Sequence, residues 1–172
     1  MDLRHHAIQL SASPGSAAAA TRPGDGGTMS SQLYLTVCGG KKEKAMALLR
    51  QHPSGIHQVS AERNTILHLA AEHGHDELIQ ELAIFGDKSL LSCQNSALDT
   101  PLHLAARAGH DKAVSLLVQL ARDCGDEGVL RCKNEAGDTA LHLAARLGHG
   151  AVVEAMLSAA PDLASEVNDA GV

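Results

Sequence analysis

Histidine is the residue type with the most chemical potential in this chain, which contains 11 of them. Imidazole nitrogens are common zinc ligands, and His68, His73 and His75 lie close together in the sequence. A helix that binds zinc usually carries two histidines four residues apart, whereas the spacings here are five and two residues. A metal-dependent enzyme built on these histidines remains an alternative that the spacing disfavours. We therefore expect no metal site, no catalytic residue and no cofactor.

Cysteine is the other residue type that offers redox or metal chemistry. Cys93 and Cys132 occupy equivalent places, in Leu-Ser-Cys-Gln-Asn and Leu-Arg-Cys-Lys-Asn. No Cys-x-x-Cys pair is present among Cys38, Cys93, Cys124 and Cys132. We interpret these side chains as small apolar groups that pack behind loops in a reduced, intracellular setting.

The composition excludes several classes of protein. The sequence has one Tyr, one Phe, no Trp and a net charge of −6, with its lysines and arginines scattered. A nucleic-acid-binding protein would show a clustered basic surface. No hydrophobic run of about 18 residues is present, and neither a nucleophile elbow nor a phosphate-binding loop occurs. These features favour a surface that binds a protein over a catalytic pocket.

A short phrase that contains histidine recurs along the chain and shows how these residues are positioned. It occupies residues 66–75, 101–110 and 140–149, and a degenerate copy covers residues 33–37. The steps between the equivalent positions 34, 68, 103 and 142 are 34, 35 and 39 residues. Self-similarity with this period predicts a stack of repeated units.

The repeated phrase resembles the signature of the ankyrin repeat. Thr100-Pro101-Leu102-His103-Leu104-Ala105-Ala106, followed by Gly109-His110, carries the resemblance most fully, and it extends over residues 30–172. It implies an all-α solenoid of four helix-turn-helix units and the start of a fifth. The expected units are residues 30–59, 60–94, 95–133, 134–167 and 168–172.

Local signals in each unit predict where its helices begin and end. Thr100 suits an N-cap and Pro101 the first helical position, and Gly109 suits a left-handed residue that ends the helix. The second helices are apolar over much of their circumference, so we expect neighbouring units to cover them on two sides. Residues 122–128 are expected to form an exposed loop insertion.

The turns between units are expected to differ in shape. Gly137 and Gly171 stand where such turns often need a positive φ, whereas Arg63 and Leu98 occupy the equivalent places. The sequence therefore predicts that the two turns without glycine depart from the shape of the others.

The resemblance also implies roles for individual residues. The repeated histidine bonds the preceding threonine and the neighbouring backbone, and the glycines end the first helices. The expected structural residues are Thr65, His68, Thr100, His103, Thr139, His142, Gly74, Gly109 and Gly148.

In ankyrin proteins the variable turn tips and the last positions of the first helices line a concave face that binds partner proteins. We expect Asp99 and Asp138 to form an exposed acidic row there, beside a partly basic row that contains Arg107 and Arg146. The expected partner-binding residues are Glu62, Asn64, Glu72, His73, Ser96, Asp99, Arg107, Glu135, Asp138 and Arg146.

Residues 1–29 differ from the repeats because they are rich in Ala, Gly, Pro and Ser. Such a segment has little apolar surface to bury, so it is expected to be disordered. A transit peptide is an alternative, and Met29 is an alternative start.

A further resemblance, carried by the variable loops and the phrase Leu33-Tyr34-Leu35-Thr36-Val37, is to plant ankyrin proteins that carry a C-terminal membrane-spanning domain, of which no residue is present in this sequence. It implies a cytosolic segment of a membrane-anchored protein in defence or stress signalling. A free soluble adaptor or inhibitor is the alternative. The last complete unit shows no polar capping substitutions, which predicts an unfinished stack.

Overall fold

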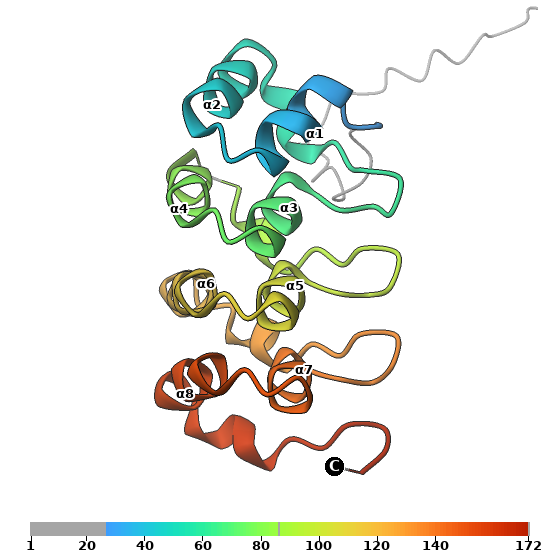
Figure 1. The fold of residues 1–172 in the computed structure, drawn as a ribbon, viewed down its shortest axis with the longest axis vertical. Coiled ribbons are helices and arrows are strands. Elements are labelled where there is room, and N and C mark those ends of the chain that lie inside the picture. Colours follow the sequence, from blue (N-terminus) through green and yellow to red (C-terminus); the bar gives the residue numbers. More distant parts are fainter. Residues whose placement is uncertain (1–26, 86, 172) are drawn as a thin grey trace, which may run out of the picture.

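The computed structural model describes residues 27–85 and 87–171. They form a stack in which each unit contributes two antiparallel helices and a projecting hairpin loop (Figure 1). The first helices of the units are α1 (Ser31–Cys38), α3 (Ile66–Glu72), α5 (Pro101–Ala108) and α7 (Ala140–Arg146). The second helices are α2 (Lys42–Gln51), α4 (Asp76–Phe85), α6 (Asp111–Asp123) and α8 (Gly150–Ala159). The predicted all-α repeat fold is confirmed.

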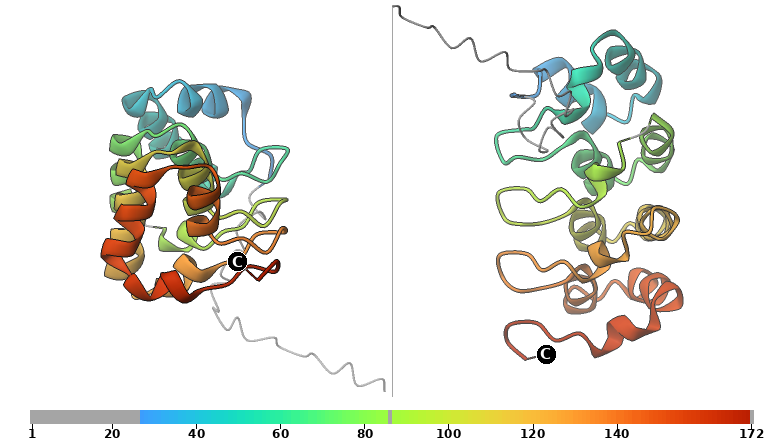
Figure 2. Two further views of the ribbon diagram at one scale, coloured as in Figure 1. Left: turned by 60° about the horizontal axis from the view of Figure 1, so that its bottom comes forward. Right: turned by 180° about the vertical axis from the view of Figure 1, so that it is seen from behind.

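The two sets of helices form two parallel columns, and the hairpins all project on the same side (Figure 2). After each second helix the chain forms a short 3-10 helix before it enters the hairpin. These are η1 (Pro53–His57), η2 (Lys88–Leu91), η3 (Glu127–Arg131) and η4 (Pro161–Ser165). Pro53 and Pro161 begin two of them, because proline lacks a backbone N–H and cannot continue the preceding α-helix.

The predicted signals set the ends of the first helices. Pro101 is the first residue of α5, and the Thr65 and Thr139 hydroxyls accept bonds from backbone N–H groups in the first turns of α3 and α7. Gly109 follows α5 with a φ of 78°, a left-handed conformation that glycine adopts without a steric penalty. These residues fix the length of each first helix, and hence the point at which its last side chains reach the surface.

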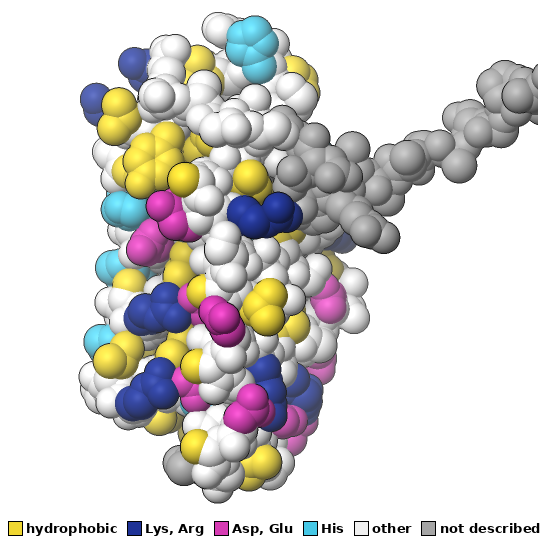
Figure 3. All heavy atoms as spheres, turned by 90° about the vertical axis from the view of Figure 1, so that its right-hand side faces the viewer, with side chains coloured by type: hydrophobic (Ala, Val, Ile, Leu, Met, Phe, Trp, Pro, Cys, Tyr) yellow, Lys and Arg dark blue, Asp and Glu magenta, His cyan; other side chains and the backbone are white. Residues whose placement is uncertain are grey.

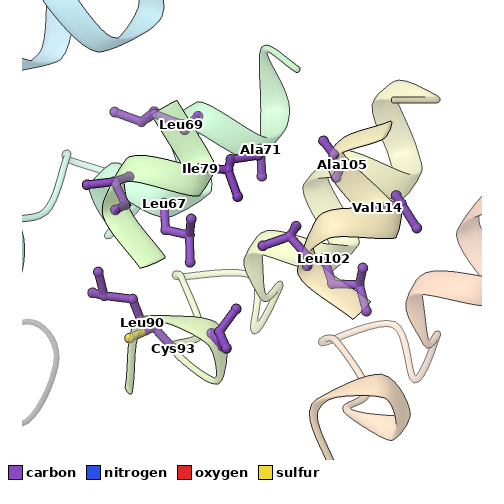
Figure 4. Close-up of a cluster of buried hydrophobic side chains, with 14 of the residues drawn as sticks. Leu67, Leu69, Ala71, Ile79, Leu90, Cys93, Leu102, Ala105 and Val114 are labelled. Atoms are coloured by element: carbon purple, nitrogen blue, oxygen red, sulfur yellow. The ribbon is translucent and has the colours of Figure 1, made fainter. Parts of the chain in front are cut away.

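The hydrophobic core runs through the whole stack and lies between units as much as within them. Leu67 and Ile79 of one unit pack close to Leu102 and Val114 of the next, with Leu90 of η2 below (Figure 4). Burial of each such side chain contributes roughly 1.5–3 kcal/mol. The interior second helices α4 and α6 are each covered by a second helix on two sides, as their broad apolar surface predicted, whereas α2 and α8 have such a neighbour on one side in the described part of the chain.

The insertion predicted at residues 122–128 is only partly a loop. Helix α6 has 13 residues and continues to Asp123, whereas α4 has 10. Ala121, four residues after Leu117, is completely buried and continues the apolar stripe by one more turn. Packing therefore extends the helix, and only residues 124–126 lie outside helical structure, because η3 begins at Glu127.

The predicted N-terminal tail extends three residues too far. Thr28 forms a parallel bridge with Val59, the Met29 amide donates to the Val59 carbonyl at 2.8 Å, and the Met29 side chain is buried. Residues 27–29 therefore belong to the repeat domain, because they pair with the strand-like segment after η1. The predicted disorder of residues 1–26 lies outside the described residues.

Candidate partner-binding surface

Each repeated histidine connects its own unit to the next. The Thr65 backbone N–H donates to His68 Nδ1 at 3.1 Å, and His68 Nε2 lies 2.9 Å from the carbonyl oxygen of Asp99 in the following hairpin. His103 repeats the arrangement with Thr100 and the carbonyl oxygen of Asp138. The contacts that the resemblance implied for these two rings are therefore present.

These contacts require neutral imidazole rings. Because Nδ1 of His68 accepts a backbone N–H, the ring proton is on Nε2, which donates it to the Asp99 carbonyl. Burial lowers the pKa of His68 to about 4, and burial also lowers the pKa of His103. His142 makes the same contacts with Thr139 at 3.2 and 2.7 Å. The rings act as neutral links between backbones, which leaves them unsuited to metal binding.

The structure shows a second series of histidines that the sequence interpretation missed. His75, His110 and His149 each lie immediately before a second helix, and each Nε2 lies 3.0–3.1 Å from a carbonyl oxygen at the end of the preceding unit's first helix. Carbonyls at helix ends lack partners within the helix, so this contact satisfies them. The signal was the recurrence of Gly-His in the later units.

Two of the three glycines before these histidines have two reasons to be glycine, a positive φ and a neighbouring ring. Gly74 and Gly109 have positive φ, and a Cβ there would lie 2.7–2.8 Å from the ring of His110 or His149. Gly148 has the same backbone conformation, but nothing lies within 4 Å of its Cβ position. A side chain at Gly74 or Gly109 would therefore collide with the histidine of the next unit, whereas a side chain at Gly148 would not.

The hairpins have the same shape in every described unit. Arg63 and Leu98 adopt φ of 63° and 58°, in the same left-handed region as Gly137 at 78°. The prediction that the two turns without glycine differ in shape is wrong. Adjacent hairpins impose the shape, since the Ser96 amide donates to the Glu62 carbonyl at 2.9 Å.

Asparagine side chains extend this ladder along the hairpins. The amide of Asn95 donates to the side-chain oxygen of Asn64, and the amide of Asn134 donates to the Asp99 carboxylate at 2.9 Å. Asn168 repeats the contact with Asp138. Each hairpin is therefore held to the previous one by a side-chain bond.

Asp99 and Asp138 do not form an exposed acidic row, which corrects the sequence prediction. Both residues are only 1 % exposed, because each carboxylate accepts an amide from the next hairpin and pairs with an arginine. A guanidinium nitrogen of Arg107 lies 2.8 Å from a carboxylate oxygen of Asp99, and a guanidinium nitrogen of Arg146 lies 2.6 Å from a carboxylate oxygen of Asp138. Burial alone would raise the pKa of Asp138, but the Asn168 bond and the Arg146 guanidinium lower it overall.

The other predicted contact residues are accessible on the inner face, which is the surface formed by the hairpin tips and the first helices (Figure 3). Asn64 is half-buried, and the guanidinium-bearing side chains of Arg107 and Arg146 are 43 % and 59 % exposed. The exposed residues are Glu62, Glu72, His73, Ser96, Arg107, Glu135 and Arg146.

Tyr34 and Leu35 also lie on the inner face, and the sequence interpretation did not include them. Tyr34 replaces the repeated histidine and is 38 % exposed, while Leu35 is 68 % exposed. Their equivalents in the next unit, His68 and Leu69, are 0 % and 2 % exposed. The loss of histidine at this one position was the available signal.

The ring nitrogens of His68, His73 and His75, which suggested a zinc site, do not point toward a common position. His73 Nδ1 lies 2.9 Å from the Leu69 carbonyl, His75 Nε2 lies 3.1 Å from the Cys38 carbonyl, and both nitrogens of His68 are engaged. Among residues 27–85 and 87–171, no three His, Cys, Asp or Glu side chains are grouped to hold a metal ion. The metal-enzyme alternative therefore has no geometric support.

The equivalent cysteines share one environment. The thiols of Cys93 and Cys132 each donate to the carbonyl four residues earlier. Burial raises the pKa of Cys93 to about 12 and also raises that of Cys132. Both side chains are thus protonated and packed behind the loop, as the sequence interpretation proposed.

Comparison with known families identifies the repeats. A family model described as ankyrin repeats matches residues 67–168 in three copies, which is more than half of the chain. Comparison with curated proteins finds no match.

Proposed function

The chain belongs to the ankyrin-repeat family, and from this premise we propose that it is a non-catalytic scaffold that holds a partner protein on its inner face. Ankyrin repeats are protein–protein interaction modules, and their fold is typically non-catalytic. An elongated stack of this kind presents an extended surface, which suits the recognition of another chain.

One observation supports the proposal above the others. Positions that repeat identically, such as His68 and His103, are buried and hydrogen-bonded within the stack. Positions that differ between units, such as Glu72 and Glu135, lie accessible on the inner face. Variable, accessible residues on a fixed scaffold support selective contact with a partner.

The cellular setting is a further part of this proposal. We propose an intracellular signalling role beside the cytosolic face of a membrane, on the basis of the resemblance to plant membrane-anchored ankyrin proteins. The free soluble adaptor or inhibitor remains the alternative. No helix in the described part of the chain is long and apolar enough to cross a membrane. Cell fractionation of the full-length gene product distinguishes the two: recovery in the membrane fraction supports the anchored form, and recovery only in the cytosol supports the adaptor.

Site-directed photo-cross-linking tests the binding face. A benzophenone side chain at Glu72, Ser96 or Glu135 on the inner face is expected to capture the partner protein in cell extract. The matched control positions Gln119 and Glu154 lie exposed on the second helices. A benzophenone side chain at either control position is expected not to capture the protein that the inner-face positions capture. Capture of the same protein from the second helices alone would contradict the proposal.

A further inference from the structure

The N-terminal end of the inner face carries a patch whose chemistry differs from that of the rest of the face. We define the α1 patch as Tyr34 and Leu35 together with the charged residues around them. These are Lys41, Lys44, Glu62 and Glu72.

The centre of the α1 patch is apolar and accessible. Leu35 is the most exposed large hydrophobic residue of any first helix, and Tyr34 presents an aromatic ring beside it. Tyr and Leu side chains that are accessible in a folded chain suit contact with an apolar side chain of a partner.

One side of this centre is basic. Leu35 forms a shallow pocket of about 250 Å³ together with Gln32, Thr36, Lys41 and Lys44. Both lysines are exposed, and neither has an ion-pair partner among residues 27–85 and 87–171. This pocket therefore offers two uncompensated positive charges beside a leucine.

The opposite side is acidic. Glu72 ends α3 next to α1, and Glu62 lies in the hairpin that follows the first unit. Neither has an ion-pair partner in the described part of the chain, although Glu62 accepts a bond from the Ser60 hydroxyl. The thiol of Cys38 chiefly raises the pKa of Tyr34, and the carboxylates of Glu62 and Glu72 raise it further. A cation between these groups would face two carboxylates and an aromatic ring.

The part of the inner face formed by α5 and α7 lacks a comparable unpaired positive charge. Arg107 and Arg146 are each paired with a buried carboxylate, so their charges are compensated within the stack. Arg63 is a further exposed base without an ion-pair partner in the described part of the chain, but it lies in the same hairpin as Glu62, at the end of the inner face that carries the α1 patch. Apolar surface with uncompensated charge of both signs on either side is therefore a property of the α1 patch.

From this arrangement we propose that the α1 patch binds a short partner segment in which an apolar residue lies between an acidic and a basic residue. The apolar side chain packs on Leu35 and Tyr34, the acidic one pairs with Lys41 and Lys44, and the basic one pairs with Glu62 and Glu72. The inference rests on the proposed function and specifies the chemistry of the partner.

A displayed library of random 12-residue peptides, selected on the full chain, tests the inference without knowledge of the natural partner. Enriched peptides are expected to share an apolar residue with acidic and basic neighbours. A fluorescein-labelled synthetic copy of the most enriched peptide is then titrated against variants by fluorescence anisotropy. Leu35→Asp and the pair Glu62→Lys with Glu72→Lys are each expected to weaken binding roughly tenfold.

The matched control carries the same change of charge elsewhere. Glu127 and Glu154 are exposed and lie away from the hairpin tips, and neither has an ion-pair partner in the described part of the chain, so Glu127→Lys with Glu154→Lys should alter binding by less than about twofold. Circular dichroism checks that every variant keeps its helical content.

Three results would overturn the inference. The first is enrichment of no peptide on the native chain, which leaves the cross-linking test of the proposed function unaffected. The second is binding that neither Leu35→Asp nor the pair Glu62→Lys with Glu72→Lys weakens, which would place the contact outside the α1 patch and leave the proposed function to the cross-linking test. The third is a dimer of the native chain that Leu35→Asp dissociates, because a second copy would then occupy the patch.

Discussion

The first unit and the interior units use the same repeat position for different purposes. In the interior units the position holds His68 or His103, whose ring is fully buried and connects two units. In the first unit it holds Tyr34, whose ring remains accessible on the inner face. The difference shows that the histidine position stabilises the stack where it makes this connection, and that it is available for binding where it does not.

Acidification is expected to break the interior connections with the largest effect. The pKa of His68 is about 4 in the folded chain and about 6.5 in the unfolded chain. Between these pH values the unfolded state binds a proton at His68 and the native state does not. Stability is complete above about pH 6.5, falls as the pH drops, and has lost roughly 3 kcal/mol from His68 alone near pH 4. The lowered pKa of His103 adds to the loss.

Urea unfolding at several pH values between 7.5 and 4 measures this effect. His68→Gln is the control, because an amide can still donate to the Asp99 carbonyl but does not titrate. The control should show a smaller dependence on pH. An identical dependence in both chains would exclude His68 as its source.

Removal of an interior ring is expected to have the next largest effect. His103→Ala leaves Thr100 and the Asp138 carbonyl without their partner in a buried site, at a cost of roughly 1–3 kcal/mol plus a cavity contribution. Tyr34→Ala, at the equivalent exposed position, should cost less than about 1 kcal/mol. Equal losses in the free energy of unfolding would contradict the contrast between the two regions.

A pair of glycines sharpens the comparison at the second histidine series. Gly109→Ala and Gly148→Ala both place a side chain at positive φ, at about 1–2 kcal/mol each. Only the first also collides with a histidine ring, at 2.8 Å from His149. Gly109→Ala should therefore lower the melting temperature clearly more than Gly148→Ala, and equal shifts would mean that the ring moves aside without cost.

The smallest expected effect concerns the hairpins. Leu98 adopts a left-handed conformation that costs a residue with a side chain about 1 kcal/mol. Leu98→Gly should relieve this strain and raise stability by roughly 0.5–1 kcal/mol, as measured by urea unfolding. A loss of stability would show that the Leu98 side chain makes a contact worth more than the strain.

The sequence predicted the repeated elements well because short local signals determine them. Thr100, Pro101 and Gly109 each act within one turn of the helix, so their effects are visible without knowledge of the neighbours. The shape of the turns at Arg63 and Leu98 was mispredicted, because bonds between hairpins outweigh the local preference for glycine.

The candidate surface was harder to predict because exposure depends on packing between units. Asp99 and Arg107 are both charged and are equally expected at the surface from the sequence. Only the structure shows that Asp99 is buried beneath Arg107. Tyr34 was visible only as a departure from the repeat. Its place on the surface follows from how α1 packs in the stack, which periodicity does not show.

Binding of the enriched peptide to Tyr34→Ala tests the central claim most directly, namely that this repeat position binds in the first unit and stabilises in the interior units. The account predicts that the dissociation constant, measured by fluorescence anisotropy, rises roughly tenfold while the chain stays folded. An unchanged dissociation constant for the folded variant would contradict the claim.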